Sequence, residues 1–589
     1  MKRLQPVISS NSLTAVGPWL LLAAIATALP AQAQAQPTRP KTRGTIQDAE
    51  IEIVKDRVNT LPEATRNFEK IRLTPPPKPD RKVTYTYPDF RLPATRLNPA
   101  IQVLTIAQEQ PEPLTGNYLK LGFGNYGTVY GRAHLHSTRN EQYSYGLDVR
   151  HQSSASGPVD DKNSAVSQTS VAATGEYYKE AITFGAALDY ARDRYHYYGY
   201  QETIVPPQEE NIRQTFNRFG VRAYARNRAP DAPLHYEVGV GYKYLKDDFA
   251  QASESNFLLD GKVGYDLNET SRVTLEAQGS FISDTEPATF GGLTSNLVRT
   301  RNFGQATPAY ELTTKTGLSL TLGATLGYSS EPLRMGENLN GVDKASINPA
   351  VRVAYAVVPE KFQVYAGLGG AIQRVTRYDL SQENPWLTHT IGLGIGQRIA
   401  DTHYGPTGYA GFTAAPAGGL ELAARATYGR TRNLYFYNIQ SDPARFGLAY
   451  DSAAVNVLTL HTELAYNVSD KWRAGLKADY NHYGVQALAH PYGRPAFVST
   501  LYGTYQATDK LTLGADFYFT SPNYATDYYQ GLDRQTNAVI DLNLRGDYRI
   551  TPKFSIFALA NNLANRKYQP YLNYPVKGFN GILGLTYSF

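Results

Sequence analysis

The sequence closes with LGLTYSF, residues 583–589, in which an apolar side chain stands at every second position. Leu583, Leu585, Tyr587 and Phe589 alternate with glycine, threonine and serine. Successive side chains of a β-strand point to opposite faces, so this stretch predicts a strand with one apolar and one polar face. A strand of this kind is typical of a transmembrane β-barrel, whose outer surface meets lipid.

The same alternation recurs from Tyr118 to the end of the chain, and charged residues return on the polar face of one segment after another. Strands of a β-sandwich average about six residues. Many runs here reach about ten residues, which is the length that a tilted strand needs to cross a bilayer. We therefore predict an all-β, antiparallel transmembrane barrel. Clear examples are 143–149, 182–190, 236–244, 273–281, 472–480 and 511–519.

Short turns alternate with long connections along this region, as in outer-membrane barrels with periplasmic turns and external loops. We expect about 22 strands, because bacterial single-chain barrels use even numbers. Twenty or 24 strands stay open, since 386–415 and 431–455 can be divided in two ways. The long loops are expected at 153–166, 196–212, 284–299, 330–344, 376–388, 484–494 and 522–535.

The composition excludes several kinds of site. The 589 residues include 45 tyrosines, which suit a wall between lipid and water, and no cysteine, which excludes disulfides and thiolate metal sites. The net charge of +6 is dispersed, so we expect no nucleic-acid partner. No Ser/His/Asp or paired-carboxylate grouping is recognisable, so we expect neither an enzyme nor a cofactor.

The region before the barrel divides into two parts. Residues 1–33 have the pattern of a signal peptide, with Lys2 and Arg3, an apolar stretch at 19–29 and a small-x-small site at 31–33. A retained membrane anchor is the alternative. Residues 34–113 are polar and rich in proline, and we interpret them as a periplasmic extension that precedes a barrel at 114–589.

One piece of that extension, residues 45–54, alternates like a strand. Glu50, Ile51, Glu52 and Ile53 are candidates for pairing with the sheet edge of a periplasmic partner protein. The alternative is a strand that packs against the barrel or against the rest of the extension. A partner protein at the cell surface is also open.

The polar faces of the strands supply candidates for the wall of a water-filled lumen. Their signs are mixed, so cross-strand ion pairs are the simplest interpretation. His134 and His136 could together hold a metal, but Arg132 opposes cation binding, and we expect no metal site. The candidate lumen-lining residues are Arg132, His134, His136, Asp148, Arg150, Glu237, Lys243, Arg473, Lys477 and Asp479.

Two further motifs have a structural interpretation. Residues 122–127 match G-x-G-x-x-G, but a strand pattern follows where a dinucleotide site needs a helix, so we expect a hairpin turn. The tyrosine-rich stretch 195–200, with Tyr528 and Tyr529, predicts an aromatic girdle at the lipid headgroups. Stacking of a sugar or siderophore ligand on these rings is the alternative.

The stretch Asn561–Tyr568 reads NNLANRKY, and the chain ends with GLTYSF. Both resemble the carboxyl end of TonB-dependent outer-membrane receptors, and a similar pattern of alternating strands and turns extends over most of 118–589. The resemblance implies a barrel in outer-membrane lipid, with Tyr587 and Phe589 as the sorting signal for the barrel-assembly machinery. Family members also carry a plug domain inside the barrel. The segment before Tyr118 is too short for one, so the chain resembles a plugless relative and TonB-coupled import does not follow.

These observations predict passage of an unidentified small-molecule solute across the outer membrane. A lumen this wide has to be occluded by the long loops, the N-terminal extension or a partner protein. The rival interpretation is a barrel that transports nothing and scaffolds an envelope protein complex.

Overall fold

The computed structural model describes residues 116–137, 140–200, 205–229, 231–290, 293–330, 345–388, 399–439 and 442–589. The signal peptide and extension predicted for residues 1–113 lie outside these ranges. No helix among the described residues has both the length and the apolar character needed to span a membrane.

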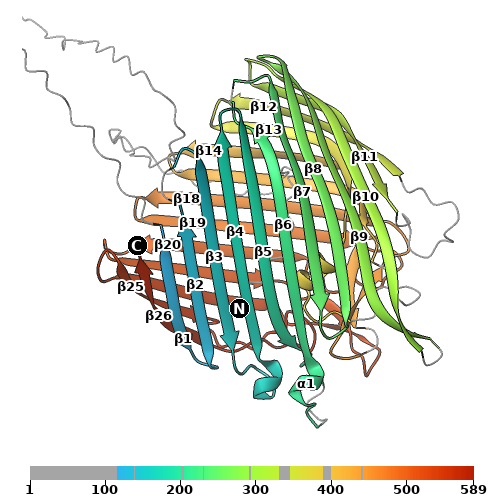
Figure 1. Ribbon diagram of the computed structural model, residues 1–589, viewed down its shortest axis with the longest axis vertical. Coiled ribbons are helices and arrows are strands. Elements are labelled where there is room, and N and C mark those ends of the chain that lie inside the picture. Colours follow the sequence, from blue (N-terminus) through green and yellow to red (C-terminus); the bar gives the residue numbers. More distant parts are fainter. Residues whose placement is uncertain are drawn as a thin grey trace, which may run out of the picture. The chain divides into compact units, whose positions relative to one another are not determined.

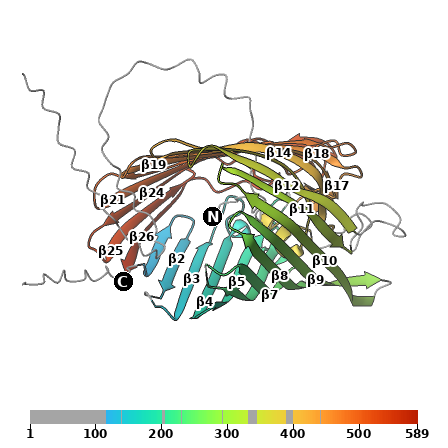
Figure 2. The ribbon, with the colours of Figure 1, turned by 90° about the horizontal axis from the view of Figure 1, so that it is seen from above.

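Twenty-two strands form one antiparallel sheet that closes on itself, because β1 pairs with both β2 and β26. Each of the remaining strands of this sheet pairs with the strands before and after it in the sheet, and Figure 2 shows the strands around a central lumen. Closure leaves no exposed sheet edge in the membrane, which an open sheet could not avoid. The expected fold and strand number are confirmed.

The strands of the first half are tallest at β9 and β10 and shortest at β1 (Figure 1). Their bounds are β1 Tyr118–Gly124, β2 Thr128–His136, β3 Tyr143–Ser154, β4 Val166–Lys179, β5 Ile182–His196, β6 Arg213–Asn227, β7 Leu234–Asp247, β8 Ala252–Asn268, β9 Ser271–Phe290, β10 Leu293–Thr313 and β11 Leu318–Ser329.

The second half completes the wall and returns to β1. Its strands are β12 Ala345–Val358, β13 Phe362–Gln373, β14 Thr402–Ala417, β15 Leu420–Arg432, β18 Val455–Ser469, β19 Trp472–Gly484, β20 Phe497–Gln506, β21 Leu511–Thr520, β24 Val539–Arg549, β25 Phe554–Asn561 and β26 Asn580–Ser588.

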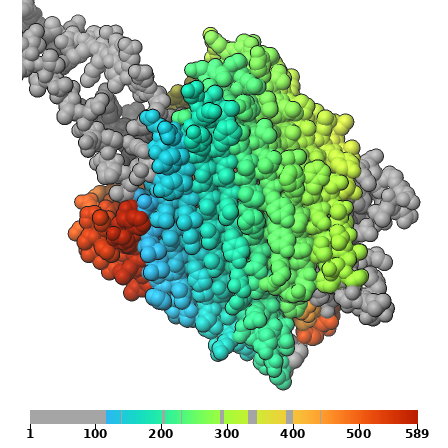
Figure 3. Space-filling view, viewed as in Figure 1, coloured from blue at the N-terminus to red at the C-terminus, as the bar shows by residue number. Residues whose placement is uncertain are grey.

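The outer surface of the wall is apolar, as the alternation predicts. Phe123, Leu583 and Leu585 are 71%, 62% and 60% exposed, values that a water-soluble protein would not give to neighbouring apolar side chains on one sheet. Figure 3 shows β1 to β11 as a continuous outer surface. The barrel therefore carries the apolar band of a membrane-spanning protein.

The connections at one end of the barrel, which we call the turn end, are short, and the long connections lie at the other end, the loop end, together with the short connections after β1, β7 and β9. Tyr118 and Ser588 pair at the turn end. Residues 125–127 form the hairpin turn that was predicted. The regions 386–415 and 431–455, which the sequence allowed to be divided in two ways, each contain part of a long connection, the first before β14 and the second before β18. The expected loop at 284–299 is wrong, because β9 and β10 continue through it as one hairpin.

Several tyrosine rings on the inner wall lie flat against the backbone of a neighbouring strand. In three ladders a tyrosine stands directly opposite a glycine, and a Cβ on that glycine would come within 2.6 Å of the ring. The glycine lets the ring lie against the backbone instead of projecting into the lumen. The pairs are Gly185 with Tyr224, Gly367 with Tyr409 and Gly475 with Tyr502.

The long connections contain their own secondary structure. Its elements are the 3-10 helix η1 Asp161–Ser164, helices α1 Glu209–Ile212 and α2 Arg377–Glu383, and the hairpins β16 Tyr435–Ile439 with β17 Phe446–Tyr450 and β22 Tyr524–Thr526 with β23 Asp533–Gln535.

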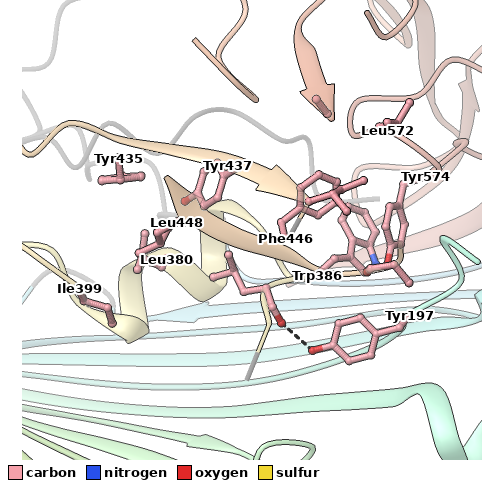
Figure 4. Packing of buried hydrophobic residues seen from close by; sticks show 14 of the residues in the cluster. Tyr197, Leu380, Trp386, Ile399, Tyr435, Tyr437, Phe446, Leu448, Leu572 and Tyr574 are labelled. Atoms are coloured by element: carbon pink, nitrogen blue, oxygen red, sulfur yellow. Dashed lines mark hydrogen bonds between the residues drawn. The ribbon is translucent and has the colours of Figure 1, made fainter. Parts of the chain in front are cut away.

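These connections share a hydrophobic cluster, which we call the loop core (Figure 4). Tyr197 donates a hydrogen bond of 2.9 Å to the carbonyl of Leu387, which belongs to a different connection. Burial of this much aromatic surface stabilises the loops against one another. The buried members of the loop core are Tyr197, Ile212, Val375, Leu380, Trp386, Leu387, Ile399, Tyr435, Tyr437, Ile439, Ala444, Phe446, Leu448, Ala525, Leu572 and Tyr574.

Candidate functional site

The connection between β13 and β14 reaches far from its own strands. Its helix α2 contacts the inner faces of β5 to β9, where charged side chains hold it. Thr376 caps the helix by accepting a 3.0 Å hydrogen bond from the amide of Asp379. We call this charged contact between α2 and the wall the latch.

The wall residue Glu254 receives the first turn of α2. Its carboxylate accepts hydrogen bonds of 2.7 and 3.2 Å from the amides of Arg377 and Tyr378. A carboxylate at the N-terminus of a helix satisfies amides that have no partner within the helix. The wall therefore supplies part of the cap of a helix that belongs to a loop.

Two buried arginines connect the latch to four carboxylates. Arg377 of α2 lies 2.8 Å from Glu286, while Arg301 of β10 lies 3.3 Å from Asp284 and donates a 2.9 Å hydrogen bond to the carbonyl of Val375. The side chain of Arg301 is only 1% exposed. Charges withdrawn from water to this degree hold their partners strongly, because the loss of one partner leaves the other buried and uncompensated.

The carboxyl half of α2 is fixed separately. Arg218 of β6 pairs with Asp193 at 2.5 Å and donates hydrogen bonds of 3.1 and 2.9 Å to the hydroxyl and carbonyl of Ser381. Deeper in the lumen, the ammonium of Lys243 lies 4.9 Å from the ring centroid of Tyr378. The helix is thus attached to the wall along its whole length.

On its other side α2 meets the loop core. The carboxylate of Glu383 accepts hydrogen bonds from Tyr435 and Tyr437 at 2.8 and 2.6 Å, and its backbone carbonyl accepts one from Tyr571 at 2.9 Å. Trp386 packs against Tyr574, with ring centroids 4.1 Å apart. Loops from well-separated strands therefore converge on α2 inside the barrel.

The predicted lumen-lining residues lie in three separate groups on the wall. On β2 and β3, Arg132 lies 3.0 Å and His134 3.5 Å from the carboxylate of Asp148. His136 contacts the carbonyl of Ser137 instead, and Arg150 stands opposite Arg132 in the ladder. In the described part of the chain, no three metal-ligating side chains gather at one point.

The second and third groups lie on other strands. Glu237 and Lys243 both lie on β7, and the carboxylate of Glu237 lies 2.9 Å from the guanidinium of Arg222. On β19, Lys477 pairs with Glu463 at 2.7 Å, Asp479 contacts His461 at 2.7 Å, and Arg473 donates to Asn467 at 2.7 Å. Cross-strand pairs account for most of these charges.

The last strand places both aromatic residues of the predicted sorting signal on the outer surface. The ring of Tyr587 lies 4.9 Å from that of Phe554 and 5.5 Å from that of Phe589. The predicted partner strand, Glu50, Ile51, Glu52 and Ile53, lies outside the described residues.

The girdle interpretation of residues 195–200 is wrong. Tyr197 is 1% exposed, and Tyr195 and Tyr198 pack edge-on against Trp386. Tyr195 occupies an inward position of β5, and Tyr197 and Tyr198 follow the strand, with Tyr197 buried in the loop core and Tyr198 packed against it. Tyr528 and Tyr529, in contrast, are 44% and 51% exposed.

Sequence reasoning missed the latch, although two signals for it were present. Thr376 and Asp379 have the spacing of a capping box, which predicts a short helix. Asp284 and Glu286 continue the inward period of β9 beyond the point where the strand was expected to end. The partner of these carboxylates lies far along the chain, so sequence spacing alone could not reveal it.

No protein-family model matches this sequence, and no curated protein matches it. Solved structures do. The copper transporter OprC matches 82% of each chain at 13% identity with a TM-score of 0.58. The ferric-catecholate import receptor Fiu from K12 E. coli also matches 82% of each chain at 13% identity with a TM-score of 0.58.

The siderophore receptor PirA from Acinetobacter baumannii is similar over 82% of this chain and 81% of its own, at 8% identity and a TM-score of 0.60. This chain has the fold of the TonB-dependent receptor barrels. At these identities the likeness concerns the barrel and its strand order, and the ligands named for these receptors are theirs.

Proposed function

We propose that this chain is an outer-membrane transport barrel whose lumen is gated by its own loops. The receptor-like fold, the apolar outer band and the transport roles named for the structural neighbours support this proposal. The wall residues predicted from the sequence would line the solute path, and the segment at residues 1–33 would direct export. The extension at 34–113 would then lie in the periplasm.

The latch is the observation that carries the proposal. A hydrophobic loop core alone could be a permanent stopper, but α2 is held to the wall by ion pairs and hydrogen bonds. Such contacts can be exchanged for contacts with water or with a charged solute when the helix moves. Opening would release α2 while the 22-stranded wall keeps its shape.

Single-channel conductance of the full chain in planar bilayers tests the gate. Arg377→Gln removes the ion pair with Glu286 and should weaken the closed state by about 3–5 kcal/mol, the usual cost of breaking a buried pair. We expect frequent openings. Arg226→Gln, which removes a wall pair with Glu176 outside the latch, is the matched control and should stay closed.

A silent Arg377→Gln barrel that still folds would contradict the gate. If that silent barrel also co-purified with one stoichiometric envelope protein, the result would favour the scaffold interpretation. Deletion of residues 48–54 tests the proposed partner strand separately, since loss of a periplasmic partner without a change in conductance would separate the two roles.

A further inference from the structure

A second group of inward side chains lies on β12 to β15, closer to the turn end than the latch. Arg352, Tyr365, Tyr409 and Arg425 come one from each strand, and we call them the arginine–tyrosine patch. The guanidinium carbon of Arg352 lies 4.7 Å from the ring centroid of Tyr365, and that of Arg425 lies 4.9 Å from the ring of Tyr409. Each arginine therefore rests on an aromatic face.

The strand register explains why the patch is compact. One row of the ladder places Arg352 opposite Gly367, which stands opposite Tyr409. The next inward row places Tyr365 opposite Gly411, which stands opposite Arg425. Because the two rows are two residues apart on the same face, both cations and both rings share one area of the inner wall.

The charge balance around Arg352 differs from that around another wall arginine that rests on a tyrosine. Arg222 also rests on a tyrosine, at 4.9 Å from Tyr224, but carboxylates of Glu237 and Asp260 neutralise it at 2.9 and 2.6 Å. Within the described ranges, Arg352 makes no ion pair. Arg352 therefore differs from Arg222 in that no carboxylate among the described residues neutralises it.

The hydroxyl of Tyr365 gives an independent indication of a ligand. Tyr365 is 5% exposed, and its hydroxyl has no hydrogen-bond partner among the described residues. The charged groups that act on this hydroxyl are Arg425 and Arg352. A buried donor without a partner costs free energy, and an acceptor held between the two arginines would remove that cost.

We propose that the arginine–tyrosine patch binds an oxyanion group, a carboxylate or a phosphate, of a small solute inside the lumen. Arginine matches such groups because its planar fork donates two parallel hydrogen bonds to two oxygens. The Tyr365 hydroxyl would donate a further bond to the same group. This proposal rests on the proposed passage of solutes, but binding at the patch requires no opening of the gate from the loop end.

Isothermal titration of the full chain in detergent, with citrate and separately with inorganic phosphate, tests the proposal. We expect saturable binding of at least one probe, and the one that binds identifies the oxyanion class. Arg352→Gln should weaken it by about tenfold or more, and the isosteric Tyr365→Phe by about threefold to tenfold. Arg222→Gln, which alters the neutralised arginine on the other wall, should leave the affinity unchanged.

Absence of saturable heat with both probes, from a barrel shown to be folded by its heat-modifiable migration in gels, would overturn the proposal. An equal loss of affinity in Arg222→Gln and Arg352→Gln would also overturn it, because the effect would then be nonspecific. Failure of the gate would appear in the conductance measurement instead, so the two proposals fail separately.

Discussion

Burial sets the chemistry of single residues in the loop core. Withdrawal from water raises the pKa of the hydroxyls of Tyr197, Tyr571 and Tyr574 well above the ordinary value for tyrosine. Each stays protonated at any physiological pH and donates a hydrogen bond to a backbone carbonyl of another loop segment. These hydroxyls therefore act as fixed connections between loops.

Lys577, in the connection before β26, gives a pH-dependent prediction. Burial lowers the pKa of its ammonium to about 8, from an ordinary value of 10.5. The folded state disfavours the charged form, so this group lowers the free energy of unfolding by its full amount below pH 8. The loss disappears as the pH rises toward 10.5. Lys577→Met should therefore raise the thermal stability of the loops at pH 7 and change it little at pH 10.5.

Differential scanning calorimetry in a detergent that tolerates both pH values would measure this effect. A stabilisation by Lys577→Met that is equal at pH 7 and pH 10.5 would show that packing, and not the charge, decides the cost at this position.

Among single residues, the sequence predicts the wall better than the site. Arg132, Asp148, Lys477 and Asp479 were placed on polar faces because a strand has a period of two, and each of them contacts another polar side chain. The role of Arg377 depends on tertiary contacts with Glu286 and Glu254, which lie 91 and 123 residues earlier in the chain. No local pattern encodes such a contact.

At the scale of elements, the pairing of tyrosine with glycine shapes the strands. Tyr502 lies against Gly475 in the ladder of β19 and β20, where a Cβ would come within 2.3 Å of the ring. Gly475→Val should push the ring off the wall and destabilise the barrel by about 1–3 kcal/mol through overpacking. The temperature at which the folded form disappears in semi-native gels measures the change.

Gly304→Val of β10 is the matched control, because a Cβ there would meet no atom within 4 Å and the glycine does not have a positive φ. A Gly475→Val barrel that melts no earlier than this control would show that the flat ring has no structural role.

Elements of the wall were more predictable than elements of the loops. Long alternating runs and short turns identify the strands, since both follow from local chain geometry. The β9–β10 hairpin continues past the predicted loop because Asp284 and Glu286 find buried partners there. Helix α2 has seven residues and depends on Glu254 for part of its cap, so its stability comes from the wall.

For the whole molecule, the decisive feature is that the loops enter the barrel. The resemblance to TonB-dependent receptors left open what fills a lumen without a recognisable plug. In the described residues, connections from β5 to β6, β13 to β14, β15 to β18, β21 to β24 and β25 to β26 pack into one loop core. The barrel scaffold thus supplies both the wall and the loops that pack together inside it at the loop end.

The most direct test of this account tethers α2 to the wall. The chain has no cysteine, so Lys243→Cys with Tyr378→Cys introduces the only two thiols, at positions whose native side chains touch. A short bis-methanethiosulfonate linker would join them, and a reductant would release them. The two substitutions also remove the contact of Lys243 with Tyr378 and the hydrogen bond from Tyr378 to Asp189, which weakens the latch. We therefore predict conductance in bilayers before linking, its loss on linking and its return on reduction. Conductance that persists with α2 tethered, or silence in all three states, would contradict a gate formed by the loops.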